Sequence, residues 1–344
     1  MCSVPAQRVF VGLDYHLESV QVCVLTQNGR VLLNRSCRND WRAIVAAIRE
    51  RLGSEVSVQA AIESCCGAAA LADELIAKAQ WSVDLAHPGY VARIKQSPDK
   101  TDYSDARLLA DLERVGYLPR VWLAPEEVRE LRRLVRYRQC LTKERRTLKL
   151  QIGATLREAR QKAPAECHAW TKAWLAWLTS AAVLSPNARL ITHCRLSRLA
   201  ALTAEIRAVE HLLAEQTSQD PLVRKLMLLK GIGLVTAATL RAEIGRFDRF
   251  RSGKQLTRFC GITPRNASSG SRQADAGLIR AGNPQLRAML VEAAHRLMRY
   301  DEKWMKFAAR LSLKGKPVSV ISAAVANRWM RWLFHQMQPE QLAA

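Results

Sequence analysis

The sequence lacks several features that define common protein classes. Glycine and proline, 16 and 12 of 344 residues, are too sparse for a fibrous or low-complexity protein. The nine cysteines form no CxxC pair, and their odd number without a framework spacing predicts free thiols in a reducing cytosol. The longest mostly apolar stretch, residues 174–184, is too short to span a membrane, and the first apolar run ends too early, at Asp14, for a signal peptide. We therefore expect a cytoplasmic protein that does not contact a membrane.

Acidic residues are also in short supply. The chain has 31 Asp and Glu against 53 Lys and Arg, which gives a formal net charge of +22. Hydrophobic residues make up 49% of the chain, so the charge does not indicate a disordered protein. A large positive field favours nucleic acid as the partner over an anionic membrane surface.

Three regions are predicted along the chain. Residues 1–125 alternate Val- and Leu-rich runs with helical stretches in the order β-β-β-α-β-α-β-α, and Asn28-Gly29 joins two of the runs as in a hairpin. This order predicts a mixed sheet flanked by helices. Residues 126–219 predict two basic helices with a coiled-coil spacing, which would form an antiparallel arm or a dimerisation stalk. Residues 220–344 predict a mostly helical domain with a Gly-, Ser- and Arg-rich loop near 263–283.

Four carboxylates occupy the ends of predicted elements in the first region. Asp14 ends the first predicted strand and Glu63 ends the fourth, whereas Asp102 and Asp105 lie one helical turn apart in KTDYSDARLLA. If the two strands are neighbours, the carboxylates converge and repel each other unless cations lie between them. Mg²⁺, or Mn²⁺, takes such oxygen ligands. The plain alternative is that these residues form turns and that Asp102 caps its helix. His16 is expected to be a surface or packing residue.

Two further segments carry candidate nucleic-acid chemistry. Residues 226–245 predict two helices around Gly231-Ile232-Gly233, which resembles a helix-hairpin-helix that brings backbone N–H groups close to a phosphate. A tight turn between packed helices explains the same glycines. The segment Ser268-Ser269-Gly270-Ser271 is flanked by Arg265 and Arg272. From composition alone it is a loop, and no neighbouring base would activate a serine in it.

The combined motifs resemble a known family from about Val9 to about Met330. VGLDYHLESVQVCVL, AIESCCG and KTDYSDARLLA are similar to the N-terminal domain of the DEDD transposases of the insertion-sequence 110 family, and AIESCCG departs from the family's more usual Glu-Ala-Thr-Gly-Tyr type of sequence. The order GITPR, Ser-Gly, AGN and LRxxLxEAA is similar to the family's C-terminal domain. The resemblance implies an α/β ribonuclease-H-like, RuvC-type domain followed by a helical coiled-coil arm and a mostly helical transposase domain.

The resemblance also implies the site and the partners. It assigns Asp14, Glu63, Asp102 and Asp105 as the metal-binding set for Mg²⁺ or Mn²⁺. It assigns Ser269 as the nucleophile that links to DNA, with Ser268 and Ser271 as near alternatives. The partners would be the DNA of the element ends and the target, a noncoding guide RNA, and further copies of the chain in a homodimer or homotetramer, in the bacterial cytosol or nucleoid. The candidate nucleic-acid contacts are Arg132, Arg133, Arg136, Arg145, Arg146, Lys149, Gly231, Gly233, Arg265 and Arg272.

Two other functions remain open from the residues. A RuvC-like, metal-dependent nuclease or resolvase of branched DNA would use the carboxylates and leave Ser269 without a role. An architectural nucleic-acid-binding protein would need neither, and the presence of all four carboxylates argues against it. No Walker-type phosphate loop occurs, which fits a reaction that conserves bond energy in a covalent link and needs no ATP.

Overall fold

The computed structural model describes residues 7–53, 55–95, 101–266, 275–279 and 281–338. The chain divides into two compact units, residues 1–124 and residues 125–344. Within the described residues, no helix combines the length and the apolar character needed to cross a membrane.

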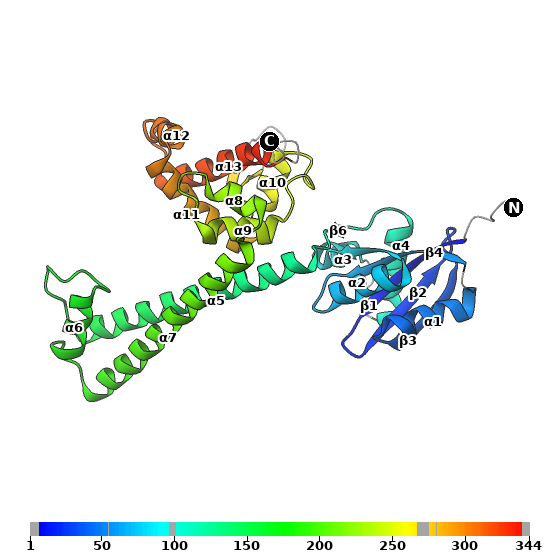
Figure 1. Ribbon diagram of the computed structural model, residues 1–344, viewed down its shortest axis with the longest axis horizontal. Helices are drawn as coiled ribbons and strands as arrows, with labels where there is room; N and C mark the ends of the chain where they lie inside the picture. The colour runs from blue at the N-terminus through cyan, green and yellow to red at the C-terminus, as the bar shows by residue number, and fades with distance from the viewer. Residues whose placement is uncertain (1–6, 54, 96–100, 267–274, 280, 339–344) are drawn as a thin grey trace. The chain divides into compact units, whose positions relative to one another are not determined.

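The first unit is built on a six-stranded mixed sheet (Figure 1). Its strand order is β3-β2-β1-β4-β5-β6, with β1, β4 and β5 parallel and the other neighbours antiparallel. The hairpin predicted at Asn28-Gly29 is present between β2 and β3, and Gly29 has the positive φ of 80° that the turn requires. The strands are β1 (Gln7–Tyr15), β2 (Ser19–Leu25), β3 (Val31–Arg38), β4 (Val56–Glu63), β5 (Ser82–Ala86) and β6 (Arg120–Val121).

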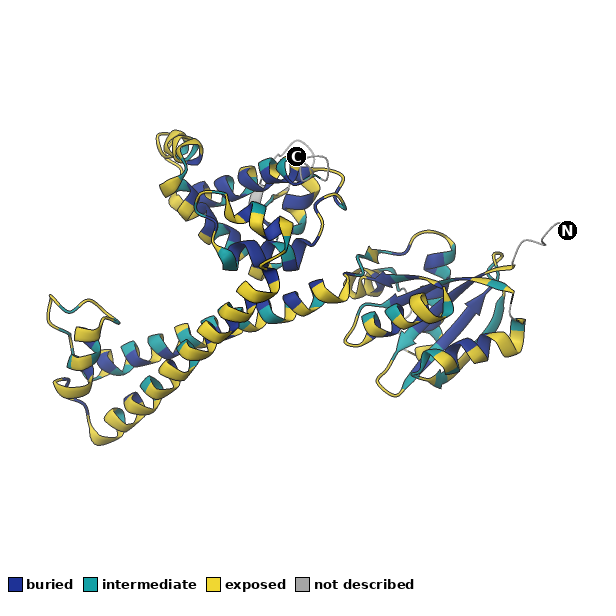
Figure 2. Ribbon diagram, in the orientation of Figure 1, coloured by how far each residue is buried: buried dark blue, intermediate teal, exposed yellow. Residues whose placement is uncertain are grey.

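Helices cover both faces of this sheet, which confirms the predicted mixed α/β class. The helices α1 (Trp41–Leu52) and α2 (Ala68–Ala79) pack on one face, where alternate β1 residues such as Val9 and Val11 are fully buried. On the other face lies α4 (Asp102–Arg114), preceded by the short α3 (Pro88–Ile94). Each fully buried aliphatic side chain contributes about 1.5–3 kcal/mol. Figure 2 shows the buried strands between helices whose outer faces are exposed.

The contact between β1 and α4 depends on small residues. A Cβ atom on Gly12 would lie 1.9 Å from the carbonyl oxygen of Ala106 and 2.5 Å from the amide nitrogen of Ala110, so glycine is required there. Asp102, Ala106 and Ala110 are spaced four residues apart and share one face of α4. Asp14 follows Gly12 by two residues and shares its face of β1. The packing therefore brings the start of α4 to the end of β1.

The second unit begins with a long helix pair. The helices α5 (Glu126–Glu158) and α7 (Pro186–Thr217) run antiparallel, because the first part of α5 shares an apolar core with the last part of α7. Near the other end of the pair, α6 (Lys172–Ser180) packs Trp174 and Leu178 against the end of α5. The antiparallel pair agrees with the predicted arm, and its description as a coiled coil stays a prediction.

The remaining helices form the largest core of the second unit, around Leu240, Leu290 and Trp329. Residues 263–283, predicted as a loop, contain two short antiparallel strands, which corrects that prediction. The helix α9 (Leu234–Ile244) packs on α5 as well as in this core, and the boundary predicted at 219/220 stays a prediction. The elements are α8 (Pro221–Met227), α9 (Leu234–Ile244), α10 (Gly253–Phe259), β7 (Pro264–Asn266), β8 (Asp275–Leu278), α11 (Pro284–Tyr300), α12 (Glu302–Ser312) and α13 (Val318–Gln336).

Candidate active site

Asp14 and Glu63 come to the same edge of the sheet. The parallel register of β1 and β4 ends with Leu13 beside Ile62, and the two acids are the next residues on each strand. Asp14 and Glu63 lie two residues after Gly12 and Ala61, and α4 covers the side of the sheet that Gly12 and Ala61 face. Because side chains alternate along a strand, both acids point to that same side. The side chain of Asp14 is 19% exposed. The strand-end convergence expected from the sequence is therefore present.

The first turn of α4 carries the other two acids. Thr101 caps the helix, and its Oγ1 accepts a hydrogen bond from the Ser104 amide at 3.2 Å, so Asp102 is the first helical residue rather than the cap. The side chain of Asp102 is 58% exposed. Asp105 is held in an ion pair with Lys95, and both of these side chains are 19% exposed. The two acids of this first turn thus differ in exposure: Asp102 is open to solvent, whereas Asp105 is largely covered and paired with a lysine.

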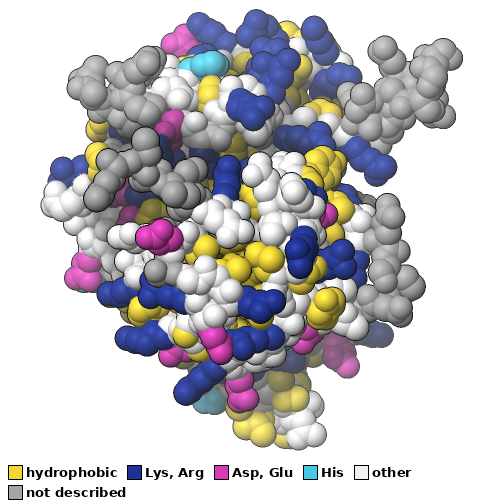
Figure 3. Space-filling model, turned by 90° about the vertical axis from the view of Figure 1, so that its right-hand side faces the viewer, with side chains coloured by type: hydrophobic (Ala, Val, Ile, Leu, Met, Phe, Trp, Pro, Cys, Tyr) yellow, Lys and Arg dark blue, Asp and Glu magenta, His cyan; other side chains and the backbone are white. Residues whose placement is uncertain are grey.

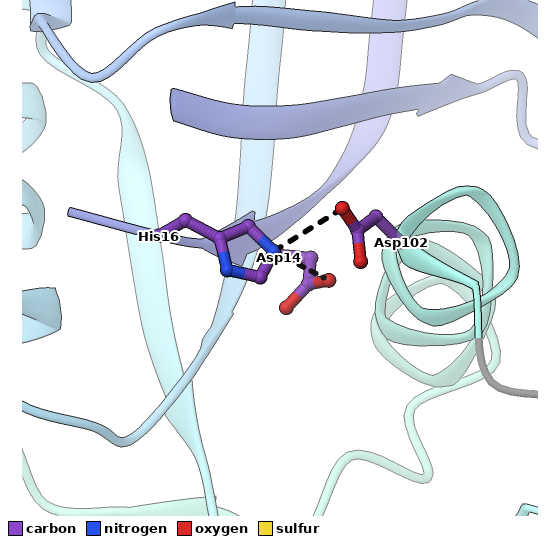
Figure 4. A group of neighbouring side chains, drawn as sticks. All are labelled: Asp14, His16 and Asp102. Atoms are coloured by element: carbon purple, nitrogen blue, oxygen red, sulfur yellow. Dashed lines mark ion pairs between the residues drawn. The ribbon is translucent and has the colours of Figure 1, made fainter. Parts of the chain in front are cut away.

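A histidine joins the acid from the strand to the acid from the helix. The Nε2 atom of His16 lies 3.5 Å from Asp14 Oδ2 and 3.4 Å from Asp102 Oδ2 (Figure 4). Potential ligand atoms of the three residues all lie within 4.8 Å of one another. His16 is on the surface, as expected, but it also lies within this candidate site. The sequence signal for this position of His16 was its spacing, because a residue two positions after Asp14 points to the same side of an extended chain.

The segment after Glu63 lies in the same negative environment. Burial raises the pKa of the Cys65 thiol, and the nearby carboxylates of Glu63 and Asp14 raise it further, against a lowering by the Ala68 backbone N–H. A raised pKa keeps this thiol protonated and poorly reactive.

The donor set fits a divalent cation. Two carboxylates and an imidazole converge from the end of β1 and the start of α4. Glu63 lies at the end of the neighbouring strand β4, and Asp105 is paired with Lys95. Converging carboxylates repel each other, and a cation between them removes this cost. Oxygen donors suit Mg²⁺ and Mn²⁺, and an imidazole nitrogen suits transition metals.

The residues around the predicted serine segment are firmly anchored. Ser268, Ser269, Ser271 and Arg272 lie outside the described residues. In the flanking chain, Asn327 Nδ2 donates to the carbonyl oxygen of Ile262 at 3.0 Å, and Arg287 Nη1 donates to that of Ile279 at 2.8 Å. Helices α13 and α11 therefore fix the chain on both sides of the serine segment.

Comparison with known proteins agrees with this arrangement. A transposase family model for IS110 DEDD proteins matches residues 11–160, which include Asp14, Glu63, Asp102 and Asp105. A second model, described as the transposase IS116/IS110/IS902 family, matches residues 223–309. The chain belongs to the IS110 family of transposases. It is accordingly a DNA transposase by enzyme class.

Individual relatives match over different lengths. The Sinorhizobium fredii protein y4qE is 29% identical over 70% of this transposase and 65% of its own length, just under two thirds. The transposase for the insertion sequence element IS1111A of Coxiella burnetii is 23% identical over 94% of this chain and 88% of its own. The transposase for IS1328 of Yersinia enterocolitica is 24% identical over 93% of this chain and 94% of its own length.

Two of the predicted nucleic-acid contacts in this transposase hold the second unit together. Arg136 makes two hydrogen bonds, of 2.8 and 2.9 Å, to the carboxylate of Glu243, which is 3% exposed. Arg132 Nε donates to the Ala242 carbonyl oxygen at 3.0 Å, and Asn283 Nδ2 donates to Glu243 at 2.8 Å. Glu243 thus joins α5 and α9 to the residue that caps α11. The sequence reasoning missed this acid because nothing local distinguishes it.

The other basic candidates are closer to solvent. Arg133 and Arg146 are exposed, Arg133 paired with Glu130, and Arg145 is half-buried. Lys149 Nζ lies 4.7 Å from the centre of the Trp170 ring, and burial, followed by the charge of Arg145, lowers the pKa of Lys149. Arg265, on β7, is exposed. Figure 3 shows Lys and Arg side chains spread over the face in view, with acidic side chains among them.

The glycine hairpin connects α8 to α9. Gly231 has a φ of 79°, and a Cβ there would lie 3.4 Å from the Cβ of Arg296, so it packs against α11. Gly233 precedes the first residue of α9 and is exposed. Gly231 thus serves the tight turn between packed helices that was the alternative to a helix-hairpin-helix. Gly233 is exposed, so the N-terminal end of α9 faces solvent.

Proposed function

We propose that this transposase cuts and rejoins the DNA of an insertion sequence through a covalent serine–DNA link, with help from a divalent cation at the carboxylate site. The observation that carries the proposal is the meeting of Asp14 and Asp102, which are distant in sequence, at one imidazole at the end of β1. The family membership supports the reaction class. The cell compartment that we propose is the cytoplasm.

The cation site would use Asp14, Glu63, Asp102 and Asp105. Mg²⁺ or Mn²⁺ held there would polarise a phosphodiester and stabilise the attacking and leaving oxygens. The chain itself prepares the site: Gly12 sets the approach of α4, and Lys95 neutralises Asp105. Of the two proposed ligands on α4, Asp102 is the more exposed, at 58% against 19% for Asp105.

The nucleophile in this proposal is Ser269. Its Oγ forms a bond to phosphorus as the bond from phosphorus to one DNA oxygen breaks. The serine proton is transferred to a base, and the departing DNA oxygen takes up a proton to become a free hydroxyl. Reversal by a different DNA hydroxyl rejoins the strand, so no ATP is required. The support for Ser269 is its position in the Ser-Gly motif between the two anchored segments.

Nucleic acid would be held by the basic residues that are free of the Glu243 cluster. Arg145, Arg146, Lys149 and Arg265 would contact phosphates, which would position a nucleic acid without reading its sequence. Gly233 would contribute the N-terminal backbone of α9 in a helix-hairpin-helix manner. Choice of target would come from a noncoding guide RNA, and the active form would be a homodimer or homotetramer in which α5 and α7 contribute to contacts between copies.

The decisive test is trapping of the covalent link. A labelled DNA substrate with a break that lets the product strand leave should yield a denaturant-resistant adduct with the parent transposase. Ser269→Ala should abolish the adduct, whereas Ser268→Ala and Ser271→Ala serve as matched controls that retain it. An adduct that survives in all three variants contradicts the serine chemistry. Metal-dependent cleavage without any adduct in the parent favours a RuvC-like nuclease or resolvase.

Guidance by RNA has a separate test. RNA that co-purifies with the transposase should map to noncoding sequence beside its gene, and its removal by ribonuclease should abolish recombination. Full recombination by RNA-free protein contradicts guidance. Light scattering of the same preparation measures the number of copies, for which we expect two or four.

A further inference from the structure

His16 occupies a position that the proposed carboxylate set does not explain. Its Nε2 faces both Asp14 and Asp102 at 3.4–3.5 Å, and its side chain is 47% exposed, so an ion arriving from solvent meets the imidazole together with the two acids. Both carboxylates lie at the same ring nitrogen rather than at opposite sides of the ring (Figure 4).

The backbone around His16 is fixed by several contacts. The His16 amide donates to the Ser19 carbonyl oxygen at 2.9 Å, which closes the turn between β1 and β2. Asn39 Nδ2 donates to the carbonyl oxygens of His16 and Leu17 at 2.8 and 3.1 Å. These contacts hold the backbone of the turn from which the imidazole reaches the two acids.

The chemistry of the donors decides which ion fits. Mg²⁺ is bound almost entirely by oxygen, whereas Mn²⁺ and the later transition metals also accept imidazole nitrogen. We propose that His16 is a nitrogen ligand of the ion held by Asp14 and Asp102, and that it gives the site a preference for Mn²⁺ over Mg²⁺. This inference rests on the proposed function, because it requires that the acids bind a divalent cation.

The test measures the metal environment directly. Metal-free, full-length transposase is loaded with Mn²⁺, and pulsed electron paramagnetic resonance records coupling between the Mn²⁺ electron spins and ¹⁴N nuclei. The parent should show this coupling. His16→Ala should still bind Mn²⁺ at the acids but lose the coupling. The matched control is His211→Ala, because His211 on α7 is exposed and, within the described residues, pairs with one acid, Glu215, whose carboxylate oxygen lies 3.4 Å away. The control should keep the coupling.

Competition between ions provides a second readout. The ratio of Mn²⁺ to Mg²⁺ affinity should fall about tenfold or more in His16→Ala, which is the usual scale for the loss of a contact that supports a metal ligand. In His16→Asp, whose donors are all oxygen, the ratio should fall while Mg²⁺ still binds. A ratio unchanged in both variants overturns the inference.

The outcomes separate this inference from the function on which it rests. Mn²⁺ that binds the parent without nitrogen coupling, and is lost in Asp14→Asn, leaves the carboxylate site intact and shows that His16 is not a ligand. Nitrogen coupling that persists in His16→Ala also overturns the inference, because another imidazole supplies it. Mn²⁺ binding that is absent from the parent, or unaffected by Asp14→Asn and Asp102→Asn, contradicts the metal site itself.

Discussion

The site acids Asp14 and Asp102 of the first unit and the buried Glu243 of the second unit have opposite surroundings. Asp14 and Asp102 are partly exposed and meet at a single histidine. Glu243 is 3% exposed and is enclosed by Arg132, Arg136 and Asn283. Both groups join segments that are distant in sequence, so long-range contact alone does not distinguish a reactive site from a structural one.

The two groups of acids differ in their burial and in the hydrogen-bond donors that surround each carboxylate. A buried carboxylate with two arginines and an amide has its oxygens satisfied, so it stabilises the fold and has no capacity for a ligand. The carboxylates of Asp14 and Asp102, which converge on one imidazole, are the kind of donor that a cation binds. Removal of each acid should therefore affect different properties of the transposase.

The largest effect is expected from Asp102→Asn. Loss of this carboxylate should lower the rate of DNA strand cleavage by about a thousandfold, because a bound metal ion stabilises the charge of the transition state by several kcal/mol. The thermal unfolding midpoint should not fall, because Asp102 is exposed and its removal relieves repulsion. Asp111→Asn, on the same helix and paired with Arg114, is the control and should keep its activity. Equal cleavage by both variants would contradict the role of Asp102.

Glu243→Ala should affect stability first. It leaves two arginine side chains near a buried position without their anion, and we expect a loss of about 3 kcal/mol in the free energy of unfolding. Urea titration measures this loss. Glu210→Ala, which removes the partner of Arg138 at a more exposed site, should cost about 1 kcal/mol or less. If the two variants lose the same stability, burial does not set the difference between them.

Gly12→Ala tests the packing that brings the acids together. Its new Cβ would overlap the backbone of α4 at Ala106 and Ala110, and overpacking of this kind costs about 1–3 kcal/mol. Mn²⁺ binding should weaken as well, because α4 carries Asp102. Gly153→Ala on α5 is the control, since its Cβ would meet only the end of the Arg157 side chain, and it should be neutral or slightly stabilising.

Glu113→Gln should produce the smallest change, and it depends on pH. Burial raises the pKa of Glu113 in spite of its 2.8 Å hydrogen bond from Arg120. Below the ordinary glutamate pKa the carboxyl is neutral in both the folded and unfolded states. As the pH rises toward the raised value, the unfolded state ionises first and folding stability falls. Unfolding titrations at several pH values should show this decrease in the parent and not in the glutamine variant.

Local signals in the sequence predicted much of the first unit. Asn28-Gly29 specifies its turn by backbone geometry, and the strand-end positions of Asp14 and Glu63 follow from the apolar runs before them. The helix predicted in KTDYSDARLLA is present as α4, although its N-cap is Thr101 and not Asp102.

The features that the sequence did not predict depend on contacts through space. The need for glycine at position 12 arises from a helix that begins far along the chain. Glu243 is structural because three partners from other elements reach it, and the role of His16 depends on where Asp102 lies. The strands β7 and β8 are short and carry Pro, Gly and Asn, which are weak strand signals.

The close contact of β1 with α4 has a consequence for synthesis of the transposase. Asp14 leaves the ribosome early, but its partner Asp102 can dock only after the intervening strands have been made and the Gly12 surface has received the helix. A nascent or truncated chain that ends before α4 therefore has acids on a sheet edge but no assembled site. If the carboxylates bind a cation as proposed, a chain that ends before α4 should neither bind that cation nor cut DNA.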